Sequence, residues 1–339
     1  MLYRHVSIGA VAHVDAPVRL TSAEIARRLR PAQDRLGIRA DVLLQDVAGI
    51  RARRVWDGST QVSEAATTAA RKALADSGVP YERIGVLINT SVCRDFLEPS
   101  TASVVHGALG LAGTCENYDV SNACLAFLTG MDIAARMIEH GDVQYALVVD
   151  AESSNEVTDR TIERLNSPGA TEEQFRRELA SLTLGSGAAA MVLGHRTLLP
   201  DGHRFRGGVS LAATAFSHLC RGSMDRMVTD SATLLDEGLK LAARTFQVAR
   251  DAFGWAGPEL DEFAVHQVSK VHTEGLVDAL GIDPTRVLAI YPEYGNVGPA
   301  SVPMVLSKLA ETGRLRRGSR VALMGIGSGL NCSMAEVVW

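Results

Sequence analysis

The sequence predicts an α/β fold made of parallel βαβ units, with helices covering both faces of the sheet. Short apolar runs typical of buried strands alternate with longer segments whose apolar residues recur at helical spacing. This alternation is typical of parallel strands, because a crossover helix must return the chain to the edge at which each strand begins. With 339 residues, the chain is long enough for two domain-sized halves.

The expected elements follow one another along the chain. Apolar runs predict strands at 84–88, 145–149, 188–193, 263–266, 287–290 and 321–324. Helical spacing predicts helices at 63–77, 125–140, 234–253 and 300–312, and a further helix is expected to begin at Pro99. The most charged stretch, 156–178, is expected to be a helical insertion on the surface.

Two similar segments indicate an internal duplication. Residues 184–193 and 325–338 each carry a Gly-Ser-Gly turn that leads into an apolar strand. We therefore expect a junction within 195–205 and two halves, residues 1–197 and residues 198–339.

The composition excludes several classes of protein. The net charge is −5, and the sequence has neither a basic patch nor the stacking aromatics that nucleic-acid binding needs. No run approaches the roughly 20 apolar residues of a membrane span, and the first residues lack the features of a secretory signal. Five widely spaced cysteines without a C-x-x-C motif favour free thiols over disulfides or a zinc site. A cytoplasmic enzyme is the expected class.

Cys124 lies where a polar segment meets a predicted helix. The residues before it, 118–123, are mostly polar, and the apolar residues after it follow helical spacing as far as Gly141, a typical C-terminal stop. Unpaired N–H groups at a helix start stabilise a thiolate, so we expect a lowered thiol pKa. The same groups hold an oxyanion when a thiolate attacks a thioester. A buried structural cysteine fits the local pattern equally well.

Two further polar residues lie at positions typical of active sites. His266 ends the predicted strand 263–266, and α/β sheets present their reactive groups at the carboxyl ends of strands. Asn296 lies between two glycines, just before a helix start that contains proline. Taken alone, each is better explained as a structural histidine and a turn asparagine.

Taken together, five segments resemble the thiolase-fold condensing enzymes of the ketoacyl synthase III branch. They are AGIRARR (48–54), YDVSNACLAF (118–127), the HQ of AVHQVS (264–269), YGNVGPASVP (294–303) and GIGSGLNCSMAEVVW (325–339). The resemblance covers the whole chain and implies a duplicated fold with five α-β-α-β-α layers and an obligate homodimer. It also implies a catalytic set of Cys124, His266 and Asn296, with an oxyanion hole formed by the backbone N–H groups of Cys124, Ser328 and Gly329.

Within that branch, the segment NTSVCRDFLEPSTASVV (89–105) is most similar to the OleA family, which joins two fatty acyl-CoAs head to head in olefin biosynthesis. Glu98 stands where other ketoacyl synthase III enzymes typically have a phenylalanine. In the OleA family, a glutamate at this place acts on the substrate of the other subunit. Without the resemblance, Glu98 is better explained as a surface acid before Pro99.

The resemblance does not extend to the nucleotide contacts of the branch. Leu43 stands where these enzymes usually have a tryptophan that stacks on the CoA adenine. Arg51 and Arg54 remain as candidate phosphate contacts, although solvated surface arginines are the simpler interpretation.

Glu98 would change the chemistry of the branch. A decarboxylating synthase obtains its carbanion by losing CO2, whereas joining two plain acyl-CoAs requires a base for the α-proton. The resemblance thus implies a Claisen condensation through an acyl-Cys124 intermediate, with Glu98 as a base whose pKa is raised in an acyl-lined pocket. We expect no cofactor beyond the CoA thioester substrates, and no metal. The expected partners are a second subunit and downstream enzymes, namely a reductase, a β-lactone synthetase and a decarboxylating hydrolase.

Three other functions remain open at this point. The first is a decarboxylating 3-oxoacyl-[acyl-carrier-protein] synthase III that uses malonyl carrier protein. The others are a cysteine thioesterase that hydrolyses the acyl-enzyme and a non-catalytic acyl-CoA-binding scaffold. The intact set of cysteine, histidine and asparagine argues against the scaffold.

Overall fold

The computed structural model describes residues 2–223, 225–255 and 260–339. Its strands are β1 (Val6–Asp15), β2 (Val18–Thr21), β3 (Ala52–Val55), β4 (Val86–Asn89), β5 (Glu116–Asp119), β6 (Tyr145–Glu152), β7 (Gly187–His195), β8 (His203–Ala212), β9 (Cys220–Gly222), β10 (Met227–Thr229), β11 (Glu262–Val265), β12 (Arg320–Gly327) and β13 (Asn331–Val338). Its α-helices are α1 (Ser22–Arg28), α2 (Arg30–Leu36), α3 (Ala40–Val42), α4 (Val62–Ser77), α5 (Thr101–Leu109), α6 (Ala126–His140), α7 (Asn155–Asn166), α8 (Glu172–Glu178), α9 (Ser231–Phe253), α10 (Lys270–Leu280), α11 (Tyr291–Tyr294) and α12 (Ser301–Glu311).

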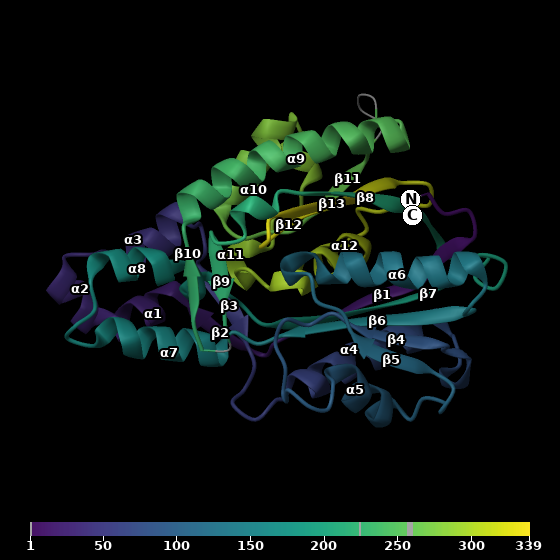
Figure 1. The fold of residues 1–339 in the computed structure, drawn as a ribbon, viewed down its shortest axis with the longest axis horizontal. Helices are drawn as coiled ribbons and strands as arrows, with labels where there is room; N and C mark the ends of the chain where they lie inside the picture. Colours follow the sequence, from purple (N-terminus) through teal and green to yellow (C-terminus); the bar gives the residue numbers. More distant parts are fainter. Residues whose placement is uncertain (1, 224, 256–259) are drawn as a thin grey trace.

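The elements form five layers in the order helix, sheet, helix, sheet, helix (Figure 1). Helices α4 and α5 cover the outer face of one sheet layer, and α9 and α10 cover the outer face of the other. Helices α6 and α12 lie between the sheets, and their apolar residues belong to one buried cluster with strands of both layers. The predicted five-layer α/β architecture is confirmed.

Both sheet layers belong to one run of nine paired strands, in the order β11-β12-β13-β8-β1-β7-β6-β4-β5. We name β5-β4-β6-β7-β1 the N-terminal ladder and β11-β12-β13-β8 the C-terminal ladder. They join where Ser7 and Ile8 of β1 pair with β8. The predicted domain boundary after residue 197 falls between β7 and β8 and stays a prediction.

The two ladders repeat one pairing pattern. In the N-terminal ladder, β4 runs parallel to β6, and β6, β7 and β1 then alternate in direction. In the C-terminal ladder, β11 runs parallel to β12, and β12, β13 and β8 alternate in the same way. The sheets are therefore mixed rather than purely parallel as predicted, because β13 returns from β12 through a turn of only three residues.

The predicted strand 287–290 does not form. Only Val287 makes an isolated bridge, to Phe263 of β11. The Gln267 side chain supplies the reason, since its Oε1 accepts the backbone N–H groups of Ile290 (2.7 Å) and Tyr291 (3.0 Å). A side chain thus takes the hydrogen bonds that a neighbouring strand would have taken, and the chain continues into α11.

Two other predictions need correction. Helix α5 begins at Thr101 rather than at Pro99, because the Ser100 side chain caps it. The segment 156–178 contains two helices, α7 and α8, as expected, but it does not lie wholly on the surface. Glu178 is fully buried and bonds to Arg164 and Arg226.

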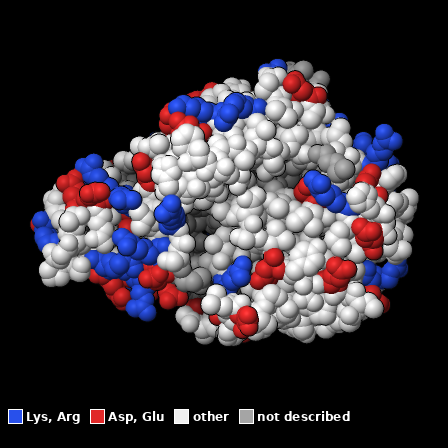
Figure 2. All heavy atoms as spheres, viewed as in Figure 1, with Lys and Arg blue, Asp and Glu red and all other residues white. Residues whose placement is uncertain are grey.

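Charged side chains are unevenly distributed over the molecule. They gather at the end formed by α1, α2, α3, α7 and α8, whereas other residues dominate the middle of the face in view (Figure 2). In the described part of the chain, no helix combines the length and apolar character that crossing a membrane requires.

Candidate active site

Cys124 lies between β5 and α6, in the tight 3-10 turn Ala123–Leu125. Two side-chain bonds hold this turn in place. Asn331 of β13 donates to Asn122 Oδ1 (3.1 Å), and Asn122 Nδ2 donates to Thr129 Oγ1 in α6 (3.0 Å). Cys124 therefore precedes the central helix directly, as its sequence context predicts.

Glycines in β12 allow the Cys124 turn to lie directly against that strand. A methyl group on Gly325 would lie 2.7 Å from Cδ2 of Leu125, and one on Gly327 would lie 3.1 Å from Cγ of the same side chain. Larger residues at these two positions would push the turn away from the sheet. The Gly-Ser-Gly pattern noted in the sequence thus has a packing function as well.

His266 directly follows β11, and its backbone N–H donates to Met324 O in β12 (2.7 Å). Its Nε2 lies 3.2 Å from Oδ1 of Asn296. That same Oδ1 accepts the backbone N–H of Gly298 (3.0 Å), which orients the Asn296 amide. Both side chains are buried, so the pair is fixed rather than solvated.

The backbone of Asn296 is held from both sides. Its N–H donates to Thr183 O (2.9 Å), and its carbonyl accepts the N–H of Gly185 (2.9 Å). The 3-10 turn Gly298–Ala300 that follows contacts the Cys124 turn. The Cys124 turn thus lies beside the turn that follows Asn296 and, across Gly325, close to His266, although Cys124 and Asn296 are 172 positions apart in the sequence.

The expected lowering of the Cys124 pKa is wrong for this structure. Burial, with smaller contributions from the nearby Cys220 and Glu152, raises the pKa of the thiol to about 12. The helix start is too small an influence to offset the loss of water around the sulfur, although the residue as a whole is only partly buried. Cys124 is thus a neutral thiol at rest, and its proton must leave during the attack on a substrate.

His266 is a neutral imidazole at physiological pH. Burial lowers its pKa to about 4, although the hydrogen bond with Asn296 acts in the opposite direction. A neutral imidazole that carries its proton on Nε2 is a hydrogen-bond donor. A buried, neutral N–H donor of this kind is suited to stabilising an oxyanion.

Glu98 lies outside this cluster. In the single chain it is exposed, in the loop that connects β4 to α5, and the expected acyl-lined pocket does not surround it. Its apolar neighbours are exposed as well: Leu97 is 86% exposed, Val92 51% and Phe96 47%. Three exposed large apolar side chains within one short loop are typical of a surface that another chain covers.

The predicted oxyanion residues Ser328 and Gly329 lie in the turn between β12 and β13. Asn331, which follows this turn, is the residue that bonds to Asn122 beside the nucleophile. The turn is therefore tied to the Cys124 segment, while the role of its N–H groups stays a prediction.

Sequence reasoning missed two carboxylates next to the site, Asp150 and Glu152. They lie at the carboxyl end of β6, and both are buried. Burial raises the pKa of both, that of Glu152 to about 7, and the two groups repel each other when both are charged. The available signal was the polar cluster directly after the apolar run 145–149.

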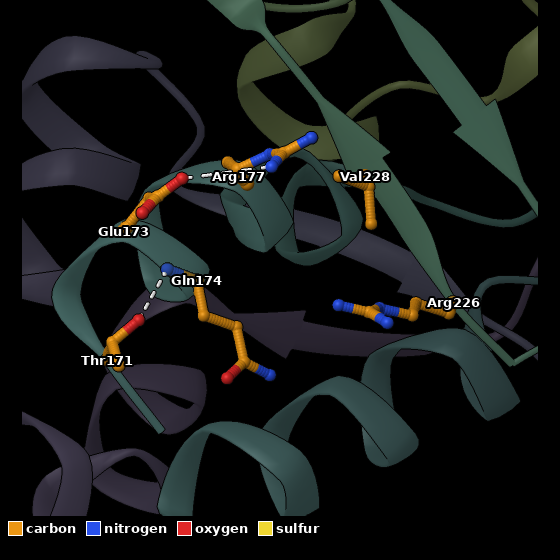
Figure 3. Close-up of a pocket in the computed structure, with 6 residues that line it drawn as sticks. All are labelled: Thr171, Glu173, Gln174, Arg177, Arg226 and Val228. Carbon is orange, nitrogen blue, oxygen red and sulfur yellow. Dashed lines mark hydrogen bonds and ion pairs between the residues drawn. The ribbon is translucent and has the colours of Figure 1, made fainter. Parts of the chain in front are cut away.

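Other candidate sites are weaker. Leu43 lies in a short π-helical turn, and Arg51 pairs with Glu293 on the surface. A polar pocket between α8 and β10 contains none of the predicted site residues (Figure 3); it is lined by Thr171, Glu173, Gln174, Arg177, Arg226 and Val228. Within the described ranges, no group of three or more His, Cys, Asp or Glu side chains is placed to hold a metal ion.

Known proteins resemble this chain over its full length. Residues 118–206 match the model for 3-Oxoacyl-[acyl-carrier-protein (ACP)] synthase III, and residues 251–339 match the model for its C-terminal part. The chain is 61% identical to the acyl-CoA:acyl-CoA alkyltransferase of Xanthomonas campestris pv. campestris and 35% identical to that of Shewanella oneidensis, with 100% of each chain covered in both cases. A crystal structure of cerulenin-bound Xanthomonas campestris OleA matches with a TM-score of 0.98 and 61% identity, covering 100% of this chain and 98% of that chain.

The chain belongs to the OleA family of thiolase-fold condensing enzymes. It is therefore an acyltransferase. Another OleA structure, a cysteine-to-serine variant of the Xanthomonas campestris protein with bound lauric acid and lauroyl-CoA, matches with a TM-score of 0.97 and 61% identity and covers 100% of both chains. The likeness to ketoacyl synthases outside the OleA family is lower: the beta-ketoacyl-[acyl-carrier-protein] synthase III of Rhodospirillum rubrum is 28% identical over 99% of both chains.

Proposed function

We propose that this enzyme joins two fatty acyl-CoAs by a Claisen condensation without decarboxylation. The products are a 2-alkyl-3-oxoacyl-CoA and free CoA, and the reaction is the first step of long-chain olefin biosynthesis. The observation that carries the proposal is the 61% identity, over the full length of both chains, to an acyl-CoA:acyl-CoA alkyltransferase. The cluster of Cys124, His266 and Asn296 supplies the groups that such a reaction needs.

In the first half-reaction, Cys124 becomes acylated. Its sulfur forms a bond to the carbonyl carbon of the first acyl-CoA, the bond from that carbon to the CoA sulfur breaks, and the thiol proton leaves with CoA as the free thiol. Backbone N–H groups of Cys124, Ser328 and Gly329 hold the oxyanion of the tetrahedral intermediate. Because the resting thiol is neutral, loss of its proton accompanies the attack rather than preceding it.

In the second half-reaction, an enolate attacks the acyl-enzyme. The thioester oxygen of a second acyl-CoA accepts hydrogen bonds from the Asn296 amide NH2 and from His266 Nε2, whose N–H turns from Asn296 Oδ1 to the substrate, and these bonds stabilise the enolate. Glu98 removes the α-proton. The enolate carbon then forms a bond to the acyl carbonyl carbon, and the bond to Cys124 sulfur breaks. Glu98 returns its proton to the thiolate through exchange with solvent.

The exposure of Glu98 in one chain supports its action in a dimer. The exposed apolar side chains of Val92, Phe96 and Leu97 precede it in the same loop and would be buried by a second copy. Covering them would place Glu98 in a poorly hydrated setting at the partner's site, where a carboxylate is a stronger base. A homodimer is therefore part of the proposal.

Product analysis with a single substrate tests the reaction type. We expect purified enzyme and lauroyl-CoA alone to give a condensed 2-alkyl-3-oxoacyl-CoA, detected by mass spectrometry. A product that forms only when a malonyl donor is present would instead identify a decarboxylating synthase. Release of lauric acid without any condensed product would identify a thioesterase.

Glu98→Ala tests the base. Acylation should persist, so one equivalent of CoA per site should appear rapidly, while condensation should fall by about 10²-fold or more. Glu82→Ala, which removes an exposed glutamate outside this loop, is the control and should condense normally. Condensation by Glu98→Ala at the wild-type rate would show that this residue is not the base.

A further inference from the structure

The loop that carries Glu98 is attached to the rest of the chain by three carboxylates. Near its start, Glu152 accepts the backbone N–H groups of Val92 (2.6 Å) and Cys93 (3.3 Å). In its middle, the loop's own Asp95 accepts two N–H groups at the start of α4 (2.8 and 3.0 Å). Just after the loop, Asp119 accepts two N–H groups at the start of α5 (2.8 and 3.1 Å). Glu98 lies between the second and third attachments.

Of these three carboxylates, Glu152 alone also faces the catalytic cluster. Its Cγ lies beside Gly298, so that a methyl group on this glycine would be 3.4 Å away. Gly298 in turn donates its N–H to Asn296. One buried side chain therefore connects the Glu98 loop to the turn that orients Asn296.

The internal duplication shows that this glutamate is specific to one half. Thr90 donates its N–H to Val149 just after β4, as His266 donates its N–H to Met324 just after β11. Val149 of β6 and Met324 of β12 are therefore equivalent positions in the two halves. The residue three positions after each of them is Glu152 in the N-terminal half and Gly327 in the C-terminal half. The half with a glycine at this position connects β11 to α10 through only four residues, 266–269, and has no long loop to hold.

We propose that Glu152 is a positioning residue for condensation, which holds the Glu98 loop in a fixed relation to the Asn296 turn. The inference rests on the proposed role of Glu98. Both oxygens of the Glu152 carboxylate accept N–H groups of the loop. The position of the loop therefore depends on an acceptor with two equivalent oxygens. Among the described residues, no lysine or arginine forms an ion pair with Glu152, and the groups that stabilise its anion all belong to the loop: the Cys93 side chain first, then the N–H groups of Val92 and Cys93.

Separate measurement of the two half-reactions tests this role. In Glu152→Gln, one carboxylate oxygen becomes an NH2 group that faces a backbone N–H donor, so the start of the loop should shift. We expect the rapid release of CoA on acylation not to fall, because the carboxylate that is removed raises the Cys124 pKa and so opposes loss of the thiol proton. Condensation should fall by about ten-fold or more, and Glu152→Asp, which keeps two oxygens, should recover part of it.

The matched control is Glu178→Gln. Glu178 is also a buried glutamate, but it bonds to Arg164 and Arg226, away from the loop. Its substitution should lower Tm without changing the ratio of condensation to acylation. Equal losses in both half-reactions of Glu152→Gln would show a merely structural role and overturn the inference.

A double-variant cycle links the effect to Glu98. Glu98→Asp keeps a carboxylate but places it one methylene farther from the substrate, so condensation is already slowed. Displacement of the loop by Glu152→Gln should then reduce the condensation rate by a smaller factor than it does in the wild type. The combined loss in Glu98→Asp/Glu152→Gln should thus be smaller than the product of the single losses, whereas independent losses would overturn the inference. If Glu98→Ala fails to condense while Glu152→Gln condenses normally, this inference alone is wrong. If Glu98→Ala condenses normally, the proposed function fails first and the inference fails with it.

Discussion

The N-terminal and C-terminal ladders share one strand pattern but surround it with different connections. In the N-terminal ladder, eleven residues (90–100) connect β4 to α5; in the C-terminal ladder, four residues (266–269) connect β11 to α10. The short connection fixes His266 beside Asn296, and Ser269 caps the helix at once. The long connection carries Glu98 out to the surface. Equivalent strand ends are thus followed by the buried donor His266 in the C-terminal half and by the exposed acid Glu98 in the N-terminal half.

A second difference concerns the turns before the two central helices. Cys124 precedes α6 in a turn packed against glycines of β12. Asn296 precedes α12 in a turn packed beside Glu152 of β6. Under the proposed function, one half holds the acyl group covalently and the other stabilises the enolate. The comparison implies that substitutions in the two halves should affect different half-reactions.

The largest expected effect belongs to the nucleophile of the N-terminal half. Cys124→Ala should abolish acylation, lowering CoA release by a factor on the order of 10⁴ or more, because no other group takes over the covalent step. The measurement is mass spectrometry of the protein after incubation with an acyl-CoA, together with the rate of CoA release. Cys220→Ala is the matched control, since Cys220 is the thiol that influences the Cys124 pKa, and it should still acylate. An acyl adduct that survives in Cys124→Ala would assign the covalent role to another residue.

A smaller and more selective effect is expected in the C-terminal half. Asn296→Ala removes a donor to the enolate and should slow condensation by about 10²–10³-fold, while acylation of Cys124 changes much less. Single-turnover measurements of CoA release and of condensed product distinguish the two steps. Asn117→Ala, on β5, serves as the control and should leave both steps unchanged. Equal losses in acylation and condensation would contradict the proposal that the C-terminal half acts mainly in the second half-reaction.

The sequence predicts the elements that are set by local patterns. The apolar runs 145–149, 188–193 and 321–324 all lie inside observed strands, because buried strands need continuous apolar side chains. It does not predict that 287–290 stays irregular, since that depends on a contact with the distant Gln267 side chain. Hydrogen bonds between residues far apart leave no local pattern.

The same distinction applies to the site. The helix start after Cys124 is local and could be predicted, but the high pKa of its thiol arises from burial by distant elements. The contact between His266 and Asn296 was expected only through resemblance to a family. Glu152 was overlooked because a polar residue after a strand is common, and its hydrogen bonds to the Glu98 loop appear only in the folded chain.

The smallest expected effect concerns the cost of keeping Glu152 buried. Burial raises its pKa from an ordinary value of 4.5 to about 7, so the folded state binds this proton more tightly than the unfolded state does. The group therefore lowers the stability of the wild type as pH rises from about 4.5 through 7, and Glu152→Gln lacks this titration. We expect the difference in Tm, variant minus wild type, to become more positive between pH 5 and pH 8, by on the order of a few degrees.

Scanning calorimetry at several pH values checks this prediction. The groups that face Glu152 also titrate or carry thiols, namely Asp150 on the same strand, Cys93 in the loop and Cys124 in the neighbouring turn. Asp150→Asn should show the same sign, because burial and Glu152 both raise the Asp150 pKa. A difference in Tm that becomes more negative with rising pH would mean that Glu152 stabilises the fold as an anion. A Tm difference that becomes more positive with pH, combined with slower condensation, would mean that the buried Glu152 destabilises the fold while it positions the long loop. The C-terminal half has Gly327 at the equivalent position and therefore no such buried acid.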